Sequence, residues 1–175
     1  MPFNFIPAPR RLPLFWLFFG LSLAFFAVFN GLDQPLRTSA APAGIVSYEL
    51  AGSPAAAGAM LASWDEAARL AVAFGLGLDF LFMPIYATAL SLAILLAADR
   101  RRSQSWIALG KFLAWGAFLA AGLDVVENIS LLRILLDGPN SGLPQLAAGC
   151  AALKFVFLIL GVGYALLGWL FKQKR

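Results

Sequence analysis

Four long apolar runs constrain the fold of this 175-residue chain more than any other feature. Each can cross the hydrocarbon core of a bilayer as an α-helix, which needs about 20 apolar residues. Apolar residues make up 61% of the chain, more than soluble proteins use, and the mean hydropathy is +0.82. We therefore predict an all-α integral membrane protein, a four-transmembrane-helix bundle forming one membrane domain over residues 1–175, with spans at about 12–30, 67–98, 106–136 and 144–171.

The first apolar run has two interpretations. One is a cleavable secretory signal, because small residues at Ser39, Ala40 and Ala41 offer a cleavage site. However, a signal has a shorter apolar core with its cleavage site close behind, whereas this run is long, rich in phenylalanine and about ten residues away from the small residues. We predict that the run is retained as the first span.

The sizeable polar segment of the chain, residues 30–63, separates the first two predicted spans. Apolar and polar residues alternate over 46–50, which predicts a short extended piece. Ser53 before a proline signals a helix start, so a short Ala-rich interfacial helix is predicted over Pro54–Ala62. We expect this segment to be extracytoplasmic, either as a connector on the membrane interface or as a lid over a polar site.

The start of the second span carries a helix-capping signal. Ser63 and Glu66 have the S-x-x-E spacing of a capping box, in which each side chain binds a free backbone amide of the first turn. The pattern predicts that the helix begins at this point.

Basic residues predict the orientation in the membrane. Lys and Arg exceed Asp and Glu by 13 to 9, and most of the basic residues lie beside the ends of apolar runs, which indicates orientation and not nucleic acid binding. One side carries Arg10, Arg11, Arg100, Arg101, Arg102, Lys172, Lys174 and Arg175; the other carries Arg37, Arg69 and Arg133. By the positive-inside rule both termini are predicted to be cytoplasmic, in a multi-pass protein of the plasma membrane, the inner membrane of a bacterium.

The absence of histidine and the single cysteine, Cys150, exclude several kinds of chemistry. A disulfide within the chain is impossible, and a bis-histidine haem, a zinc hydrolase site or a thiol relay would lack its ligands. We expect no cofactor and no dedicated metal site, although carboxylates remain suitable ligands for hard cations.

The stretch Gly122–Arg133 places polar residues inside the third span. Asp124, Glu127 and Asn128 follow the i, i+3, i+4 spacing that stacks side chains on one helix face. A charged group at bilayer depth costs a few kcal/mol, so such residues usually face a bundle interior or a wet cavity. This face is the centre of the predicted site.

Further polar residues are predicted at the same depth. Asp79 in the second span and Lys154 in the fourth both lie about ten residues from the outer ends of their helices. We expect Lys154 to pair with one carboxylate, and at least one other carboxyl group to be protonated or to have a cation, water or ligand nearby. The candidate ligand-binding or proton-relay residues are Asp79, Tyr86, Asp124, Glu127, Asn128, Lys154 and Tyr164.

Three kinds of function fit these residues. The first is binding or translocation of a small cation, an amine or an amphipathic, lipid-like ligand, with proton coupling; transport by so narrow a bundle would need a homodimer. The second is a membrane enzyme in which Asp124 or Glu127 acts as general acid or base on a lipid or isoprenoid, although no known catalytic motif is present. The third is an accessory subunit of a larger assembly, in which the polar residues only lock the helix register. The partners expected in each case are the lipid bilayer and a small-molecule or lipid ligand, without nucleic acid.

Overall fold

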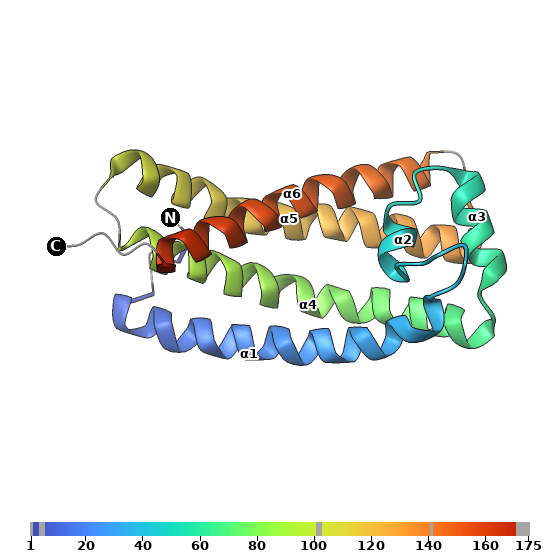
Figure 1. Cartoon of the computed structure of the whole chain (residues 1–175), viewed down its shortest axis with the longest axis horizontal. Coiled ribbons are helices and arrows are strands. Elements are labelled where there is room, and N and C mark those ends of the chain that lie inside the picture. The colour runs from blue at the N-terminus through green and yellow to red at the C-terminus, as the bar shows by residue number, and fades with distance from the viewer. Residues whose placement is uncertain (1, 4–5, 101–102, 141, 171–175) are drawn as a thin grey trace. The chain divides into compact units, whose positions relative to one another are not determined.

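The computed structural model describes residues 2–3, 6–100, 103–140 and 142–170, and every regular element among them is helical. The predicted all-α class is therefore confirmed. Arg101, Arg102, Lys172, Lys174 and Arg175 of the orientation argument, and the last residue of the fourth predicted span, lie outside the described residues. The elements in chain order are α1 Ala8–Asp33, η1 Gln34–Leu36, α2 Ile45–Glu49, α3 Pro54–Ser63, α4 Glu66–Ala98, α5 Gln104–Asp137 and α6 Leu143–Leu170 (Figure 1).

Three of the helical segments are long and apolar enough to cross a membrane: Ala8–Leu36, Glu66–Ala98 and Leu143–Leu170. They coincide with the first, second and fourth predicted spans. In the most apolar stretch of the first segment only 11% of the residues are buried, against 56% in Glu66–Ala98, so α1 exposes most of its apolar surface. The third predicted span coincides with α5, whose crossing of the membrane stays a prediction, as does the four-span bundle.

The chain divides into two compact units, and each long helix contributes residues to both. Unit 1 comprises Met1–Leu23, Met83–Gly122 and Lys154–Arg175. Unit 2 comprises Ala24–Phe82 and Leu123–Leu153.

Small residues determine the helix packing in unit 1. The sequence spacing of Gly116 with Ala120 predicts a close helix approach, and a Cβ added at Gly116 would lie 2.7 Å from Phe157 of α6. Ala120 is fully buried. A Cβ at Gly168 would meet the Cβ of Ala97, so the backbones of α4 and α6 approach each other where neither helix has a large side chain.

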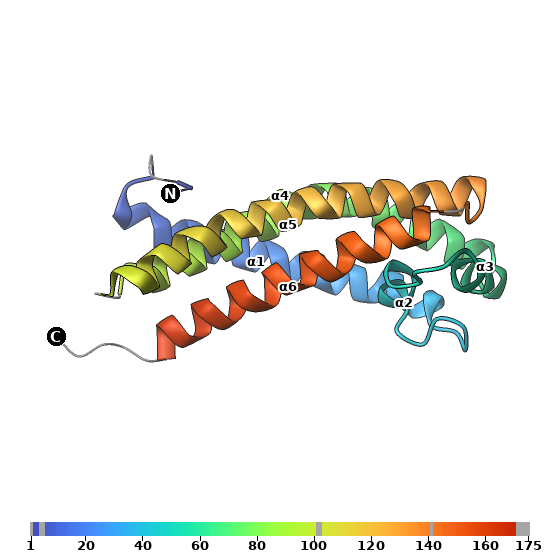
Figure 2. The ribbon, with the colours of Figure 1, turned by 90° about the horizontal axis from the view of Figure 1, so that it is seen from above.

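The core of unit 2 joins the segment 34–64 to the long helices. Its buried apolar residues come from η1, α2, α3, α4, α5 and α6. The indole Nε1 of Trp64 donates a hydrogen bond to the carbonyl of Leu36 at 2.9 Å, and the Tyr48 hydroxyl donates one to the carbonyl of Leu131 in α5 at 3.1 Å. In both views α2 and α3 lie at the end of unit 2 where α5 passes into α6 (Figure 1, Figure 2).

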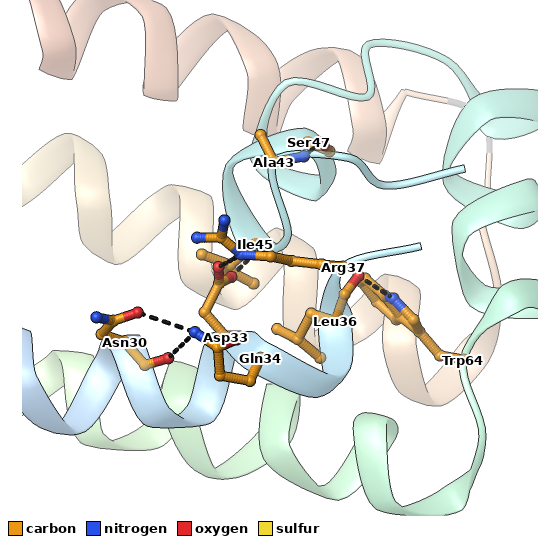
Figure 3. A network of polar contacts seen from close by, with 9 residues as sticks. All are labelled: Asn30, Asp33, Gln34, Leu36, Arg37, Ala43, Ile45, Ser47 and Trp64. Carbon is orange, nitrogen blue, oxygen red and sulfur yellow. Dashed lines mark hydrogen bonds and ion pairs between the residues drawn. The ribbon is translucent and has the colours of Figure 1, made fainter. Parts of the chain in front are cut away.

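The predicted extended piece at 46–50 is wrong, because residues 46–49 belong to α2 and Leu50 is its C-cap. Gly44 precedes the helix with a φ of +58°, which an L side chain rarely adopts, and the Asp33 carboxylate accepts the amide of Ile45 at 2.7 Å (Figure 3). Asp33 also accepts Nε of Arg37 at 2.9 Å. These contacts start a helical turn, and the buried Tyr48 fixes it. An alternation of apolar and polar residues over only five positions is a weak indication of extended backbone, and here the contacts of Asp33 and Tyr48 favour a helical turn.

The helix starts are as predicted at α3 and different at α4. Ser53 caps α3, since its side chain accepts the Ala56 amide at 3.2 Å. At α4, however, the Asp65 carboxylate accepts the Ala68 amide at 2.8 Å. Ser63 instead ends α3 and donates its hydroxyl to the Met60 carbonyl at 2.7 Å. The capping box predicted from Ser63 is therefore wrong, because Asp65 and not Ser63 accepts a free amide of the first turn of α4.

Replacing Tyr48 by phenylalanine should remove a contribution to stability that the wild-type protein itself loses at high pH. Burial raises the pKa of the Tyr48 phenol above its ordinary value, so the folded state holds this proton more tightly than the unfolded state does. The resulting stabilisation is complete below pH about 10 and is lost as the pH rises further. Tyr48→Phe should lower the free energy of unfolding in detergent by about 1 kcal/mol at neutral pH, and this deficit should shrink above pH about 10. A deficit that stays constant with pH would contradict the assignment.

Candidate functional site

The polar face of α5 points away from the exposed surface of the helix. Asp124 is 3% exposed, Glu127 0% and Asn128 1%, whereas the neighbouring Ile129 is 48% and Val126 40% exposed. This division follows from the i, i+3, i+4 spacing, which keeps the three polar side chains on one face. The remaining face can meet lipid, so the sequence prediction of an inward polar face agrees with the burial.

Asn128 connects this face to α4 within unit 2. Its Nδ2 donates a hydrogen bond to Oδ2 of Asp79 at 2.8 Å and another, at 3.3 Å, to the backbone carbonyl of Leu76. Both acceptors lie on α4, one turn apart on the same side. The amide therefore bridges a half-buried carboxyl group and the helix backbone, and it fixes how α5 is rotated against this part of α4.

Three carboxyl groups thus belong to the polar part of unit 2: Asp79, Asp124 and Glu127. In general, a carboxylate that is isolated at the centre of a bilayer costs about 2.5 to 3.5 kcal/mol. Bringing a proton, a metal cation or an ammonium group to such carboxylates removes this penalty. Chemically, the arrangement is suited to holding positive charge or to exchanging it for a proton.

The other three candidate residues, Lys154, Tyr86 and Tyr164, belong to unit 1. Lys154 is 5% exposed, with Nζ 5.0 Å from the centroid of the Phe155 ring. The Tyr164 hydroxyl donates to the Trp106 carbonyl at 2.9 Å, and the two rings stack with centroids 4.8 Å apart. Tyr86 is half-buried on α4. The pairing of Lys154 with one carboxylate stays a prediction.

The hydroxyl group of Ser130, next to the polar face in the sequence, forms a hydrogen bond within its own helix. The Ser130 hydroxyl donates to the carbonyl of Val126, one turn back in α5, at 2.7 Å, a bond that serines inside helices commonly form. Within the described residues no group of three or more His, Cys, Asp or Glu side chains is placed to hold a metal ion.

Sequence reasoning missed two contributors to this region. The Leu76 carbonyl accepts from Asn128, and a backbone acceptor has no sequence signal. The Tyr48 hydroxyl donates to the carbonyl of Leu131 in α5, one turn beyond Glu127. In the sequence, nothing but the presence of a tyrosine in a polar segment indicated this contact.

Comparison of the chain with protein-family models, with curated proteins and with solved structures gives no match.

Proposed function

We propose that this chain is a polytopic membrane protein that binds a small cation, an amine or an amphipathic molecule with a cationic head at the acidic face of α5. The observation that carries the proposal is the burial of Asp124 and Glu127 beside the bond between Asn128 and Asp79. Carboxylates in a medium of low dielectric constant bind positive charge far more strongly than carboxylates in water, and this face gathers them in a part of the chain that is otherwise apolar.

Proton exchange follows from the same argument. In the proposed exchange, a proton occupies the acidic face when no ligand is bound, and the cation takes its place. Binding then releases a proton from the carboxyl group as the ligand's charge replaces it. If the ligand also crosses the membrane, this exchange couples its movement to a proton gradient, and a homodimer would supply the wider path that transport needs.

The proposed setting is the plasma membrane, with four spans and both termini in the cytoplasm. Its support lies in unit 1, where Arg11 contacts Asp99 and the Arg100 guanidinium lies over Trp169. Basic and tryptophan side chains thus gather at the ends of α1, α4 and α6, as expected at a cytoplasmic membrane boundary.

Substituting the buried glutamate tests the proposal. With the lipophilic cation tetraphenylphosphonium as a probe, wild-type protein in detergent should bind it, and Glu127→Gln should weaken the binding at least about tenfold, which corresponds to about 1.4 kcal/mol. Asp124→Asn serves as the second variant if Glu127→Gln does not fold. Glu66→Gln is the matched control, because Glu66 is an exposed glutamate in the same unit.

The opposite results would identify a structural network. If the folded Glu127→Gln and Asp124→Asn variants bind the probe as tightly as wild-type protein does, the acidic face is no binding site. Equal weakening in Glu66→Gln would show that the probe responds only to overall charge.

A further inference from the structure

One end of unit 1 collects basic and aromatic side chains from three helices. Here α1 begins, and α4 and α6 end (Figure 1). We call this group the arginine–tryptophan cluster; its members are Arg10, Arg11, Asp99, Arg100 and Trp169.

Arg11 is held in place from two sides. Its Nη1 contacts Oδ2 of Asp99 at 3.2 Å, and its Nε donates to the Ile6 carbonyl at 3.2 Å. The side chain of Arg11 is 14% exposed and that of Asp99 is 47% exposed. The ion pair thus ties the first turn of α1 to the end of α4 and neutralises one of the arginines.

Arg100 is positioned differently, by an aromatic ring. Its Cζ lies 4.6 Å from the centroid of the Trp169 ring, a cation–π contact, and the Trp169 ring packs against Phe15 of α1 at 5.8 Å. Stacking uses the flat face of a guanidinium and leaves the N–H groups along its edge available. Arg100 itself is exposed, so its guanidinium is accessible to a ligand from outside the unit.

The cluster carries excess positive charge. Three arginines against one aspartate give a net charge of +2, and the sequence continues with Arg101 and Arg102. Below this charge α1 presents apolar surface, with Trp16 54% exposed. Positive charge above an exposed aromatic surface matches a molecule with an anionic head and an apolar tail.

We propose that the arginine–tryptophan cluster is a binding site for the headgroup of an anionic phospholipid. The phosphodiester accepts hydrogen bonds from the edge of the Arg100 guanidinium and is attracted by Arg10. The acyl chains lie along the exposed face of α1 that includes Trp16. The contact with Trp169 already orders the Arg100 guanidinium before the lipid binds, which lowers the entropic cost of binding. This site lies in unit 1 and does not depend on the proposed cation site.

Lipid titration followed by native mass spectrometry tests this site. Purified full-length protein in detergent is titrated with phosphatidylglycerol and, separately, with phosphatidylcholine. The wild-type protein should prefer phosphatidylglycerol, and Arg100→Gln should weaken its binding about fivefold, the effect of one basic residue near a charged membrane surface. Arg100→Lys should recover only part of the loss, because lysine keeps the charge and loses the planar stack.

The matched control is Arg133→Gln, which removes the same charge from an exposed position in unit 2 and should leave phosphatidylglycerol binding unchanged. Equal losses in the two Gln variants would show general charge attraction and overturn the proposal. So would the absence of any preference for phosphatidylglycerol, or full displacement of the lipid by inorganic phosphate. If Arg100→Gln does not fold, phosphatidylglycerol binding is measured for Trp169→Leu instead, and unchanged binding in that variant contradicts the site.

Discussion

Replacing Gly168 by leucine is expected to force α4 and α6 apart and to destabilise the protein by about 3 kcal/mol. A Cβ at this position already meets the Cβ of Ala97, and alanine has no flexible side chain that could move away. The larger side chain can be accommodated only by a shift of a helix backbone. Unfolding in mixed micelles, followed by circular dichroism, measures the change.

The matched control for this prediction is Gly163→Leu on the same helix. A Cβ added at Gly163 has nothing within 4 Å, so leucine there should extend into open space and change stability little. If the two variants are equally stable, the close contact between α4 and α6 does not exist in solution.

Replacing Asn128 by leucine is expected to destabilise unit 2 by about 3 kcal/mol. The variant keeps a similar volume but removes the donor that Asp79 and the Leu76 carbonyl share. A carboxyl group and a carbonyl would then lose a hydrogen bond in surroundings where water cannot easily replace it. The same unfolding experiment measures the effect.

Asn140→Leu serves as the control for the second prediction, since Asn140 is exposed and the change of side chain is identical. It should alter stability by less than about 0.5 kcal/mol. A folded Asn128→Leu variant as stable as wild-type protein would show that the bridge between α4 and α5 contributes nothing.

The long helices and the buried face of α5 were predictable because both follow from local sequence. Apolar runs determine helix length, so the predicted span at 67–98 differs from α4 by one residue at its start. The spacing of Asp124, Glu127 and Asn128 determines that they share a face, whatever packs against it. The burial of that face could be predicted because exposure to lipid would be too costly.

Contacts between distant residues could not be predicted in the same way. Asp79 and Asn128 are 49 positions apart, and their bond depends on how two helices are rotated, which no single apolar run specifies. The helix α2 was missed because Asp33, twelve residues before Ile45, caps it. The cap of α4 was assigned to Ser63 when Asp65 supplies it, because two acceptable capping residues lie within one turn and only their backbone geometry distinguishes them.

The contacts of segment 34–64 decide how easily this segment could move away from α5 as a lid. Its contacts with α5 include the buried bond from Tyr48 to Leu131 and an edge-to-face contact between Tyr48 and Trp64, with ring centroids 5.1 Å apart. A lid movement would have to break this bond and expose both rings. The connector interpretation therefore needs no rearrangement, whereas the lid interpretation requires one that Tyr48→Phe should make easier.

The central proposal is that the buried acidic face of α5 exchanges a proton for a cation, and infrared difference spectroscopy tests it most directly. Wild-type protein in lipid is compared before and after addition of tetraphenylphosphonium at constant pH. The C=O band of a protonated carboxyl group should decrease as carboxylate bands grow, and Glu127→Gln should abolish most of this change while Glu66→Gln retains it. Spectra that do not change when the cation is added, or a change that survives in Glu127→Gln and Asp124→Asn alike, would contradict the claim.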